Sequence, residues 1–222
     1  MKRILYAVLF ITSISFAQEK ITTNLGDFHT LKTYRGLQVE LIKDDTPKVV
    51  IDGIKASNVT VKNSNGVLRI SMNISHTFSA DDVMVYLYYS KEINLIDANE
   101  GSHIFSDELF KQTEIEVKAQ EAGHIKLNIE TDMVNVTSVT GGIIKLKGKS
   151  VNQKAKANTG GIYKGENLET ESADVSAHTG GVAEIHATNF ADASAHTGGM
   201  ITVSGDPEEL KKSESLGGYV KQ

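Results

Sequence analysis

The 222-residue sequence predicts an all-β fold, a single-stranded parallel β-helix (β-solenoid) whose rungs contain about 19 residues each. Three observations lead to this prediction. A glycine-rich corner recurs at a nearly constant interval, the residues around it alternate between apolar and polar, and cysteine is absent. Without disulfides or thiolate metal sites, the chain must be stabilised by a packed core and by hydrogen-bonded backbone ladders.

The glycine corners define the repeat. Four of them read Thr140-Gly141-Gly142, Thr159-Gly160-Gly161, Thr179-Gly180-Gly181 and Thr197-Gly198-Gly199, with steps of 19, 20 and 18 residues. Leu216-Gly217-Gly218 continues the series, and Ala122-Gly123 and Glu100-Gly101 precede it, which gives seven rungs. Glycine accepts a positive φ and lets neighbouring backbones approach closely, so these pairs are expected to be structural corners. A repeat of this length is typical of one β-helix turn, stacked about 4.8 Å from the next.

Side chains on either side of each corner alternate as they do in strands, which places every second residue inward. Two columns precede the corner: Val117, Val136, Ala155, Val175 and Ala193, and Ala98, Ala119, Ser138, Ala157, Ala177 and Ala195. Two columns follow it: Ile104, Ile125, Ile144, Tyr163, Ala183, Ile201 and Val220, and Leu127, Leu146, Ile185 and Val203. These columns are the expected core, and the polar residues between them are expected to face water.

Residues 28–95 are also rich in strand-forming residues but lack the regular period of residues 96–222. Asn63-Ser64-Asn65-Gly66 predicts a turn between two of these strands. We expect this region to continue or cap the same stack, because an open solenoid end exposes strand edges that can aggregate. The sequence therefore predicts a single solenoid domain over residues 18–222.

The first 17 residues have the features of a signal peptide. Lys2 and Arg3 precede an apolar run from Ile4 to Phe16, and Ser15-Phe16-Ala17 has the form of a signal-peptidase site. The run is too short to span a bilayer as a helix, and the mature chain contains no longer apolar segment. We expect cleavage after Ala17 and export to the periplasm or the cell surface of a Gram-negative bacterium.

The charge balance narrows the range of partners. The formal net charge is -5, and removal of residues 1–17 takes away Lys2 and Arg3 but no acidic residue, so the mature chain carries -7. Binding to phosphates requires clustered Lys and Arg, so an acidic chain disfavours nucleic acid and anionic lipid as partners.

At several places the chain resembles the "putative auto-transporter adhesin, head GIN domain" family, exported proteins of Bacteroidetes-type bacteria. The resemblance rests on Phe28-x-x-Leu31, on Gly36-Leu37-Gln38-Val39-Glu40-Leu41, on Asn65-Gly66-Val67-Leu68-x-Ile70 and on the later glycine-rich rungs. It implies a right-handed parallel β-helix in a cell-envelope setting. It assigns no catalytic or binding residue.

Two pairs of histidines occupy equivalent places in successive rungs. His178 and His196 each stand in Ala-His-Thr-Gly-Gly and are expected to stack outward, and His103 and His124 form a second pair. Two imidazoles one rung apart can share a metal, but a metal site usually needs a third ligand and supporting contacts. The favoured interpretation is a solvent-facing polar ladder, with no metal and no cofactor.

Asp174 and Asp192 also align, and two carboxylates one rung apart approach the separation of a retaining glycosidase pair, roughly 5 Å. A carbohydrate-active enzyme, either a polysaccharide lyase or a glycosidase, is therefore the alternative hypothesis. Against it, the turns between rungs are too short to build a cleft, and fold analogy is a poor guide to chemistry. The favoured interpretation is a pair of exposed aspartates.

The threonines of the four corners, Thr140, Thr159, Thr179 and Thr197, form a column of hydroxyls. Such a column can bind ice or sugar, but its place in the alternation predicts that it points inward and has a structural role. No nucleophile elbow, phosphate loop or dinucleotide fingerprint is present. The sequence thus predicts an exported, non-catalytic binding or structural module, with an envelope glycan or an envelope protein as its partner.

Overall fold

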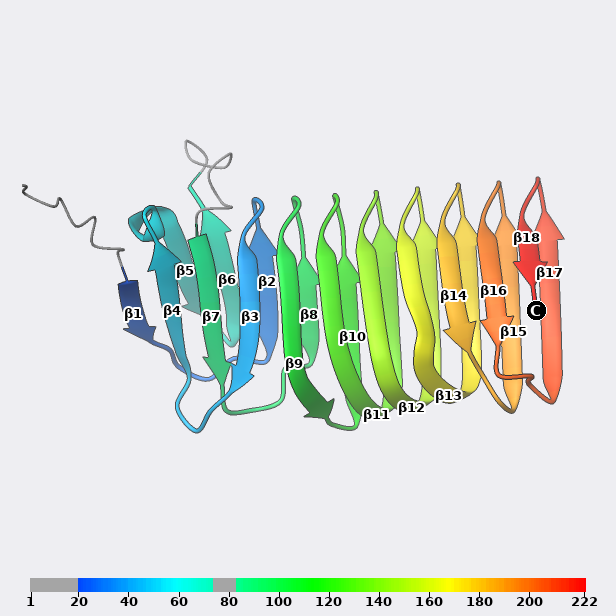
Figure 1. Cartoon of the computed structure of the whole chain (residues 1–222), viewed down its shortest axis with the longest axis horizontal. Helices are drawn as coiled ribbons and strands as arrows, with labels where there is room; N and C mark the ends of the chain where they lie inside the picture. Colours follow the sequence, from blue (N-terminus) through cyan, green and yellow to red (C-terminus); the bar gives the residue numbers. More distant parts are fainter. Residues whose placement is uncertain (1–19, 74–82) are drawn as a thin grey trace, which may run out of the picture.

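The computed structural model, which describes residues 20–73 and 83–222, confirms the all-β solenoid. Its strands stack side by side into a flattened coil with a narrow ridge at one edge and a broad bend at the other (Figure 1). Within these ranges no helix is both long and apolar enough to cross a membrane. The expected signal peptide, residues 1–17, lies outside the described residues.

The strands are β1 (Lys20–Asn24), β2 (Thr30–Tyr34), β3 (Gln38–Lys43), β4 (Lys48–Gly53), β5 (Val59–Ser64), β6 (Val67–Met72), β7 (Val83–Tyr89), β8 (Leu95–Ala98), β9 (His103–Lys111), β10 (Glu114–Ala119), β11 (His124–Val139), β12 (Ile143–Asn158), β13 (Ile162–His178), β14 (Val182–His186), β15 (Phe190–His196), β16 (Met200–Ser204), β17 (Glu209–Ser215) and β18 (Tyr219–Lys221). A short 3-10 helix, η1 (Ala56–Asn58), precedes β5.

Two sheet faces form the body of the solenoid. Face A contains the strands that run toward the ridge, namely β6, β2, β8, β10, the second halves of β11 to β13, β15 and β17. Face B contains the strands that leave the ridge, namely β7, β3, β9, the first halves of β11 to β13, β14, β16 and β18. Each of the long strands β11, β12 and β13 passes from face B to face A through the bend.

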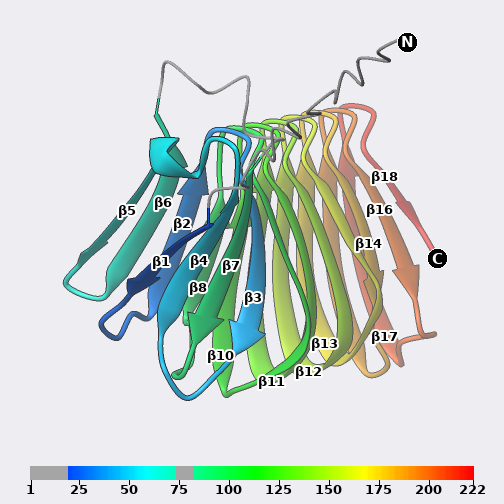
Figure 2. The ribbon, with the colours of Figure 1, turned by 60° about the vertical axis from the view of Figure 1, so that its left-hand side comes forward.

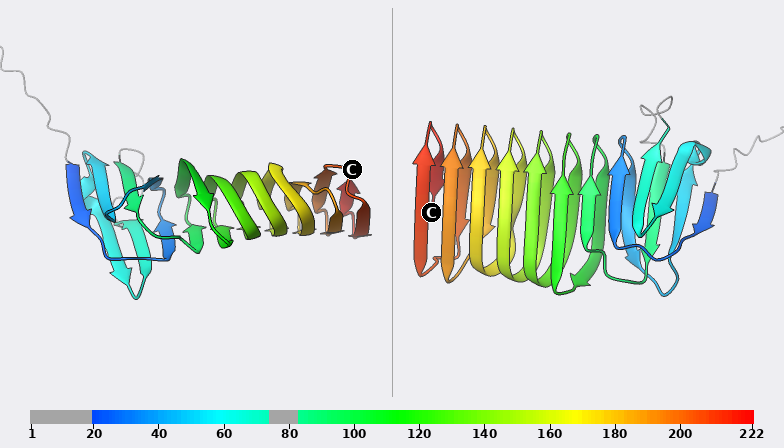
Figure 3. Two further views of the ribbon diagram at one scale, coloured as in Figure 1. Left: turned by 90° about the horizontal axis from the view of Figure 1, so that it is seen from below. Right: turned by 180° about the vertical axis from the view of Figure 1, so that it is seen from behind.

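The N-terminal region departs from a simple continuation of the coil. Strands β2 and β3 form a rung that lies between the rung of β6 and β7 and the rung of β8 and β9, although it precedes both in sequence (Figure 2). Beyond β6 and β7 the pairing becomes antiparallel: β5 pairs with β6, β4 with β7 and β1 with β4. These strands make the N-terminal end wider than the regular stack (Figure 3). They cover the strand edges that the solenoid would otherwise expose there.

The four predicted columns form part of the core, which also contains a further apolar column on face A and the apolar residues of the N-terminal strands. In the first predicted column, Val117, Val136, Ala155, Val175 and Ala193 are register partners across five successive rungs and are all buried. The Ile104-to-Val220 column is likewise in register and buried. The alternation predicted from the sequence is confirmed in both faces. The predicted turn at Asn65-Gly66 is also confirmed, between β5 and β6, with φ of 52° and 76°.

One rung of the core holds a large polar residue. Tyr163 is fully buried, and its hydroxyl donates a hydrogen bond to Gln153 Oε1 over 3.0 Å. Gln153 Nε2 in turn donates to Thr170 Oγ1 over 2.8 Å. The ring of Tyr163 occupies the space that a side chain at position 165 would fill, because a Cβ built on Gly165 meets that ring. The preceding rungs have Leu127 and Leu146 in this column. Position 165 is a glycine because the ring of Tyr163 already fills the space that a leucine side chain would need.

Buried tyrosines make the fold sensitive to alkali. Burial, with a smaller contribution from Glu166, raises the pKa of Tyr163, and burial with Glu108 raises the pKa of Tyr89 to about 12. In the unfolded chain tyrosine titrates near about 10, so the folded state holds its protons more tightly above that pH. The stability that these two tyrosines contribute in this way is fully present below a pH of about 10. It is lost as the pH rises through their pKa values in the folded state. We expect urea midpoints to fall steadily above pH of about 10, with a smaller fall in Tyr163→Phe. Equal pH dependence in the two proteins would contradict this assignment.

Tight turns form the ridge. In the turn of Thr159 and Gly160 both residues have positive φ, 50° and 70°, and Gly161 N–H donates to Asn158 O over 2.9 Å. These are the features of a type I′ turn. Equivalent turns lie at Arg35-Gly36, Glu100-Gly101, Glu121-Ala122, Thr140-Gly141, Thr179-Gly180, Thr197-Gly198 and Leu216-Gly217. All seven predicted corners are among these ridge turns of the described chain, and the turn at Arg35-Gly36 adds the rung of β2 and β3.

The two glycines of each corner have different roles. The first, as at Gly141, Gly160, Gly180 and Gly198, has positive φ and open space around it. The second, as at Gly142, Gly161, Gly181 and Gly199, would place a Cβ against the backbone carbonyl of the preceding rung. Backbone N–H groups also link the rungs along the ridge, for example from Gly160 to Thr179 O over 3.1 Å. The first glycine therefore serves the turn, and the second serves the stacking.

The ridge threonines occupy an unfavourable backbone conformation. Thr179 has φ of 49° at the first central position of its turn, where β-branched residues are disfavoured and asparagine before glycine is preferred. Thr179→Asn keeps the backbone carbonyl that accepts the Gly160 bond. We expect this change to raise the free energy of unfolding by roughly 0.5–1 kcal/mol in urea denaturation. A loss of stability would show that the Thr179 side chain contributes contacts that outweigh the strain.

The C-terminal rung carries charged residues at positions that are core alanines in the preceding rung. Lys212 is in register with Ala193, and Glu214 with Ala195. Glu214 Oε1 accepts a hydrogen bond from Val220 N–H over 2.6 Å. Charges on an edge strand and an occupied backbone donor both oppose pairing with another strand.

Candidate functional site

His178 and His196 lie on face A immediately before the ridge. They are register partners in β13 and β15, and their partly exposed rings stack with centroids 5.0 Å apart and planes inclined by 28°. The ladder continues to Ser215, whose Oγ lies 2.5 Å from His196 Nδ1. On face B, His103 and His124 stack with centroids 4.3 Å apart. No group of three or more His, Asp or Glu residues suited to a metal ion occurs in residues 20–73 and 83–222.

Asp174 and Asp192 are register partners on face A, so the structure does bring the predicted carboxylate pair together. Asp174 is exposed, and its Oδ2 lies 3.2 Å from Lys154 Nζ. Neither aspartate lines either of the two large hollows described below. Glycosidases hold a sugar ring between their carboxylates inside a cleft, and these two stand on a flat strand face.

The threonine ladder of Thr140, Thr159, Thr179 and Thr197 corrects a sequence prediction. All four side chains are exposed, whereas the alternation predicted that they point inward. Alternation fails here because the positive φ of both turn residues rotates the chain out of the extended conformation on which the two-residue period depends. The structural role of the hydroxyls was predicted because the side chains were expected to point inward, and they do not. A row of outward-facing threonines runs along the ridge.

The sequence did not reveal a groove that runs along the bend. It has a volume of about 640 Å³, and its floor contains a column of polar side chains that includes Thr131, Ser150 and Thr170. Thr131 Oγ1 donates to Ser150 Oγ over 3.0 Å, and Ser150 Oγ donates to Asn152 O over 2.8 Å. The floor is therefore largely engaged within the protein. The column recurs about every 19 residues, and this spacing is the signal that would have found it.

Charged pairs line one side of the groove. Lys111 Nζ lies 2.5 Å from Glu130 Oε1, and Lys149 Nζ lies 3.1 Å from Glu169 Oε2. A second hollow of about 760 Å³, between the bend and the N-terminal region, shares Lys111 with the first. The lining of the first groove contains more acidic residues than lysines, because Glu92, Asp132 and Glu171 add to the two ion pairs.

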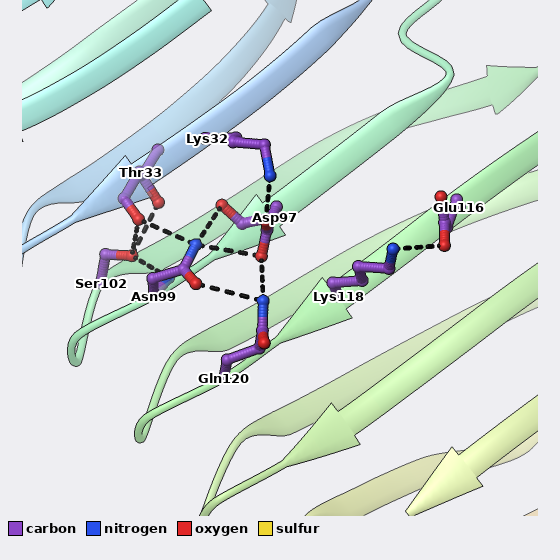
Figure 4. A network of polar contacts seen from close by, with 8 residues as sticks. All are labelled: Lys32, Thr33, Asp97, Asn99, Ser102, Glu116, Lys118 and Gln120. Carbon is purple, nitrogen blue, oxygen red and sulfur yellow. Dashed lines mark hydrogen bonds and ion pairs between the residues drawn. The ribbon is translucent and has the colours of Figure 1, made fainter.

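A network of polar contacts fastens the inserted rung to its neighbours (Figure 4). Asp97 on β8 is only 2% exposed although it belongs to an outward column. Its carboxylate forms an ion pair with Lys32 Nζ over 2.9 Å and accepts hydrogen bonds from Asn99 Nδ2 and Gln120 Nε2 over 3.0 and 3.1 Å. The contacts connect β2, β8 and β10, and the arrangement is that of a structural clamp between these strands.

Comparison with known proteins supports the fold over nearly the whole chain. A family model described as "Putative auto-transporter adhesin, head GIN domain" matches residues 27–207. No curated protein matches the chain.

Several solved structures share the fold. A protein from Bacteroides fragilis described as a putative adhesin is similar with a TM-score of 0.85 and 16% identity, over 93% of this chain and 97% of that one. A Parabacteroides distasonis protein described as a putative lipid binding protein gives a TM-score of 0.69 at 16% identity, with the same coverage. A putative adhesin from Parabacteroides merdae gives a TM-score of 0.67 at 15% identity, over 93% of this chain and 96% of that one. At these identities the likeness concerns the fold.

Proposed function

Because the chain belongs to the "Putative auto-transporter adhesin, head GIN domain" family, we propose that it is an exported, non-catalytic binding module of the bacterial cell envelope. One observation carries the proposal: at several outward positions on both faces, successive rungs present the same kind of side chain in register. Such a surface suits an extended ligand that contacts several rungs. Each rung contributes weakly, and the contacts gain strength by acting together.

The proposed ligand is an envelope glycan or the surface of another envelope protein. Two of the similar proteins described above are called adhesins and one is called lipid binding, which supports a binding role without identifying a ligand. Nucleic acid is not proposed, because the chain is acidic overall.

Export to the periplasm or the cell surface of a Gram-negative bacterium is part of the proposal. Its support is the charged and apolar beginning of the sequence and the origin of the similar proteins from Bacteroides and Parabacteroides. N-terminal sequencing of the protein recovered from the envelope should begin at Gln18. Recovery of the intact chain from the cytoplasm would contradict export.

The enzyme hypothesis finds little support in the geometry. Asp174 is held by Lys154, and neither Asp174 nor Asp192 lies in one of the two large hollows. A glycosidase acid catalyst stands beside a sugar bound in a cleft, and neither aspartate has such a cleft beside it among the described residues.

A single experiment separates these functions. The mature protein, residues 18–222, is applied to a glycan array and to immobilised envelope polysaccharides and envelope proteins, and release of products is monitored for every ligand that is retained. We expect specific retention without turnover, weakened by replacing His178 and His196 when the ligand lies on face A. Turnover abolished by Asp174→Asn would overturn the non-catalytic assignment, and absence of retention on every surface would remove the binding role.

A further inference from the structure

Face B carries a row of like charges. Lys126, Lys145 and Lys164 are register partners on β11, β12 and β13, and all three side chains are exposed. Adjacent strands lie about 4.8 Å apart, so the three lysine side chains leave the sheet at the spacing of the rungs. Lys147, exposed on β12 two residues beyond Lys145, lies on the same face. We call these four residues the lysine ladder.

Three other lysines of the regular rungs stand opposite carboxylates. Lys111 faces Glu130, Lys149 faces Glu169 and Lys154 faces Asp174 in direct register, and each pair forms an ion pair. The lysine ladder forms no ion pair with any described residue, and although Glu184 follows Lys164 in register, the two are not in contact as an ion pair. Like charges directly opposite each other on neighbouring strands destabilise a sheet. A chain with a net charge of -5 therefore keeps an unfavourable row of cations that form no ion pair within the described residues.

An apolar column runs beside the ladder on the same face. Ile143, Ile162 and Val182 are register partners two residues nearer the ridge, and their side chains are partly exposed. Met200 extends this column and is 48% exposed. The combined surface presents an apolar strip next to a strip of positive charge, both parallel to the axis of the stack.

We propose that the lysine ladder binds an acidic polysaccharide that lies along face B, and this assignment rests on the binding role proposed above. The carboxylate or sulfate groups of the polymer contact the ammonium groups, and the apolar faces of its sugar rings rest on the isoleucine and valine column. A linear polyanion matches the geometry because its charges repeat along one direction, as the lysines do. Its presence removes the repulsion that the free protein contains.

The test compares two triple variants that alter net charge equally. The first is Lys126→Gln/Lys145→Gln/Lys164→Gln. The control is Lys118→Gln/Lys154→Gln/Lys211→Gln, three lysines that form ion pairs away from the ladder. Retention is measured on immobilised polygalacturonate, on neutral dextran and on phosphatidylglycerol vesicles, at several salt concentrations.

We expect the wild-type protein to bind polygalacturonate, with affinity that falls as salt rises, and not dextran. The ladder variant should lose about tenfold or more in affinity, while the control stays within about twofold of the wild type. The ladder variant should also have a slightly higher thermal midpoint, because its like-charge contacts are gone. This second result does not depend on the probe and shows that the variant is folded.

Three results would overturn the assignment. These are equal losses in the two variants, undiminished binding by the ladder variant, and binding to vesicles in place of polygalacturonate, which would make the ladder a lipid-contact surface. If the ladder variant still retains other ligands in the array experiment, the binding role stands and only the acidic polysaccharide is excluded.

Discussion

Gly161→Ala is expected to lower the free energy of unfolding by about 3 kcal/mol or more, since overpacking against backbone cannot relax by a rotamer change. The new Cβ would overlap the backbone carbonyl of Ser138 in the preceding rung, and rung spacing is fixed by the hydrogen bonds on both sides. Accommodation requires the two rungs to separate at the ridge. Chemical denaturation monitored by circular dichroism measures the loss.

The neighbouring Gly160→Ala is the matched control. Gly160 has positive φ, but a Cβ there has open space, so only the backbone penalty of roughly 1–2 kcal/mol applies. The difference between the two variants therefore isolates the contact between rungs. If Gly160→Ala proves as costly as Gly161→Ala, the role assigned to the second glycine is wrong.

Asp97→Ala is expected to cost about 3 kcal/mol, the lower part of the range for breaking a buried ion pair. The substitution leaves Lys32 without its partner and removes one acceptor each from the side-chain amides of Asn99 and Gln120. The cost falls short of the upper range because the Lys32 side chain is 28% exposed and can reach water. The measurement is again the free energy of unfolding from urea titration.

Asp174→Ala supplies the comparison for this prediction. Asp174 also pairs with a lysine of a neighbouring rung, Lys154. Its side chain is 61% exposed, however, and solvent screens the ion pair. We expect almost no change in stability there. The double variant Asp97→Ala/Lys32→Met should recover part of the loss, because it removes the unpaired charge; no recovery would mean that the amide contacts dominate.

The period and the core columns could be predicted from the sequence because every regular rung repeats the same local environment. A small inward space selects alanine or valine at one position, rung after rung, and the contact between rungs selects glycine at Gly142, Gly161, Gly181 and Gly199. These constraints are local and recur at a constant spacing. The period therefore survives in the sequence even where the residues change.

The arrangement of the N-terminal strands could not be predicted in this way. The choice of partner for β2 and β3 depends on strands that follow much later in the chain, and no single residue records it. The burial of Asp97 could not be predicted for the same reason, since its partner Lys32 lies 65 residues away in the sequence. The outward direction of Thr179 depends on the sign of φ in its turn, which the two-residue alternation does not contain.

The candidate surfaces also differ in whether the repeat in the sequence predicts them. Stacking of His178 on His196 follows from the period alone. The lysine ladder also recurs at 19-residue intervals, but the net charge of -5 does not show how the charges are distributed over the surface. The groove at the bend combines side chains from several rungs and from the N-terminal region, so its shape required the three-dimensional structure.

The insertion of β2 and β3 between two later rungs sets a sequence of events for folding. From β10 onward, each new rung needs only the rung made just before it, so this part can grow one step at a time as the chain emerges. The β2–β3 rung must wait until β6 to β9 are available on both sides. We expect pulse-labelling hydrogen exchange to find its amides protected together with those of β6 to β9. Protection of β2 and β3 before those strands would show that the rung forms without them.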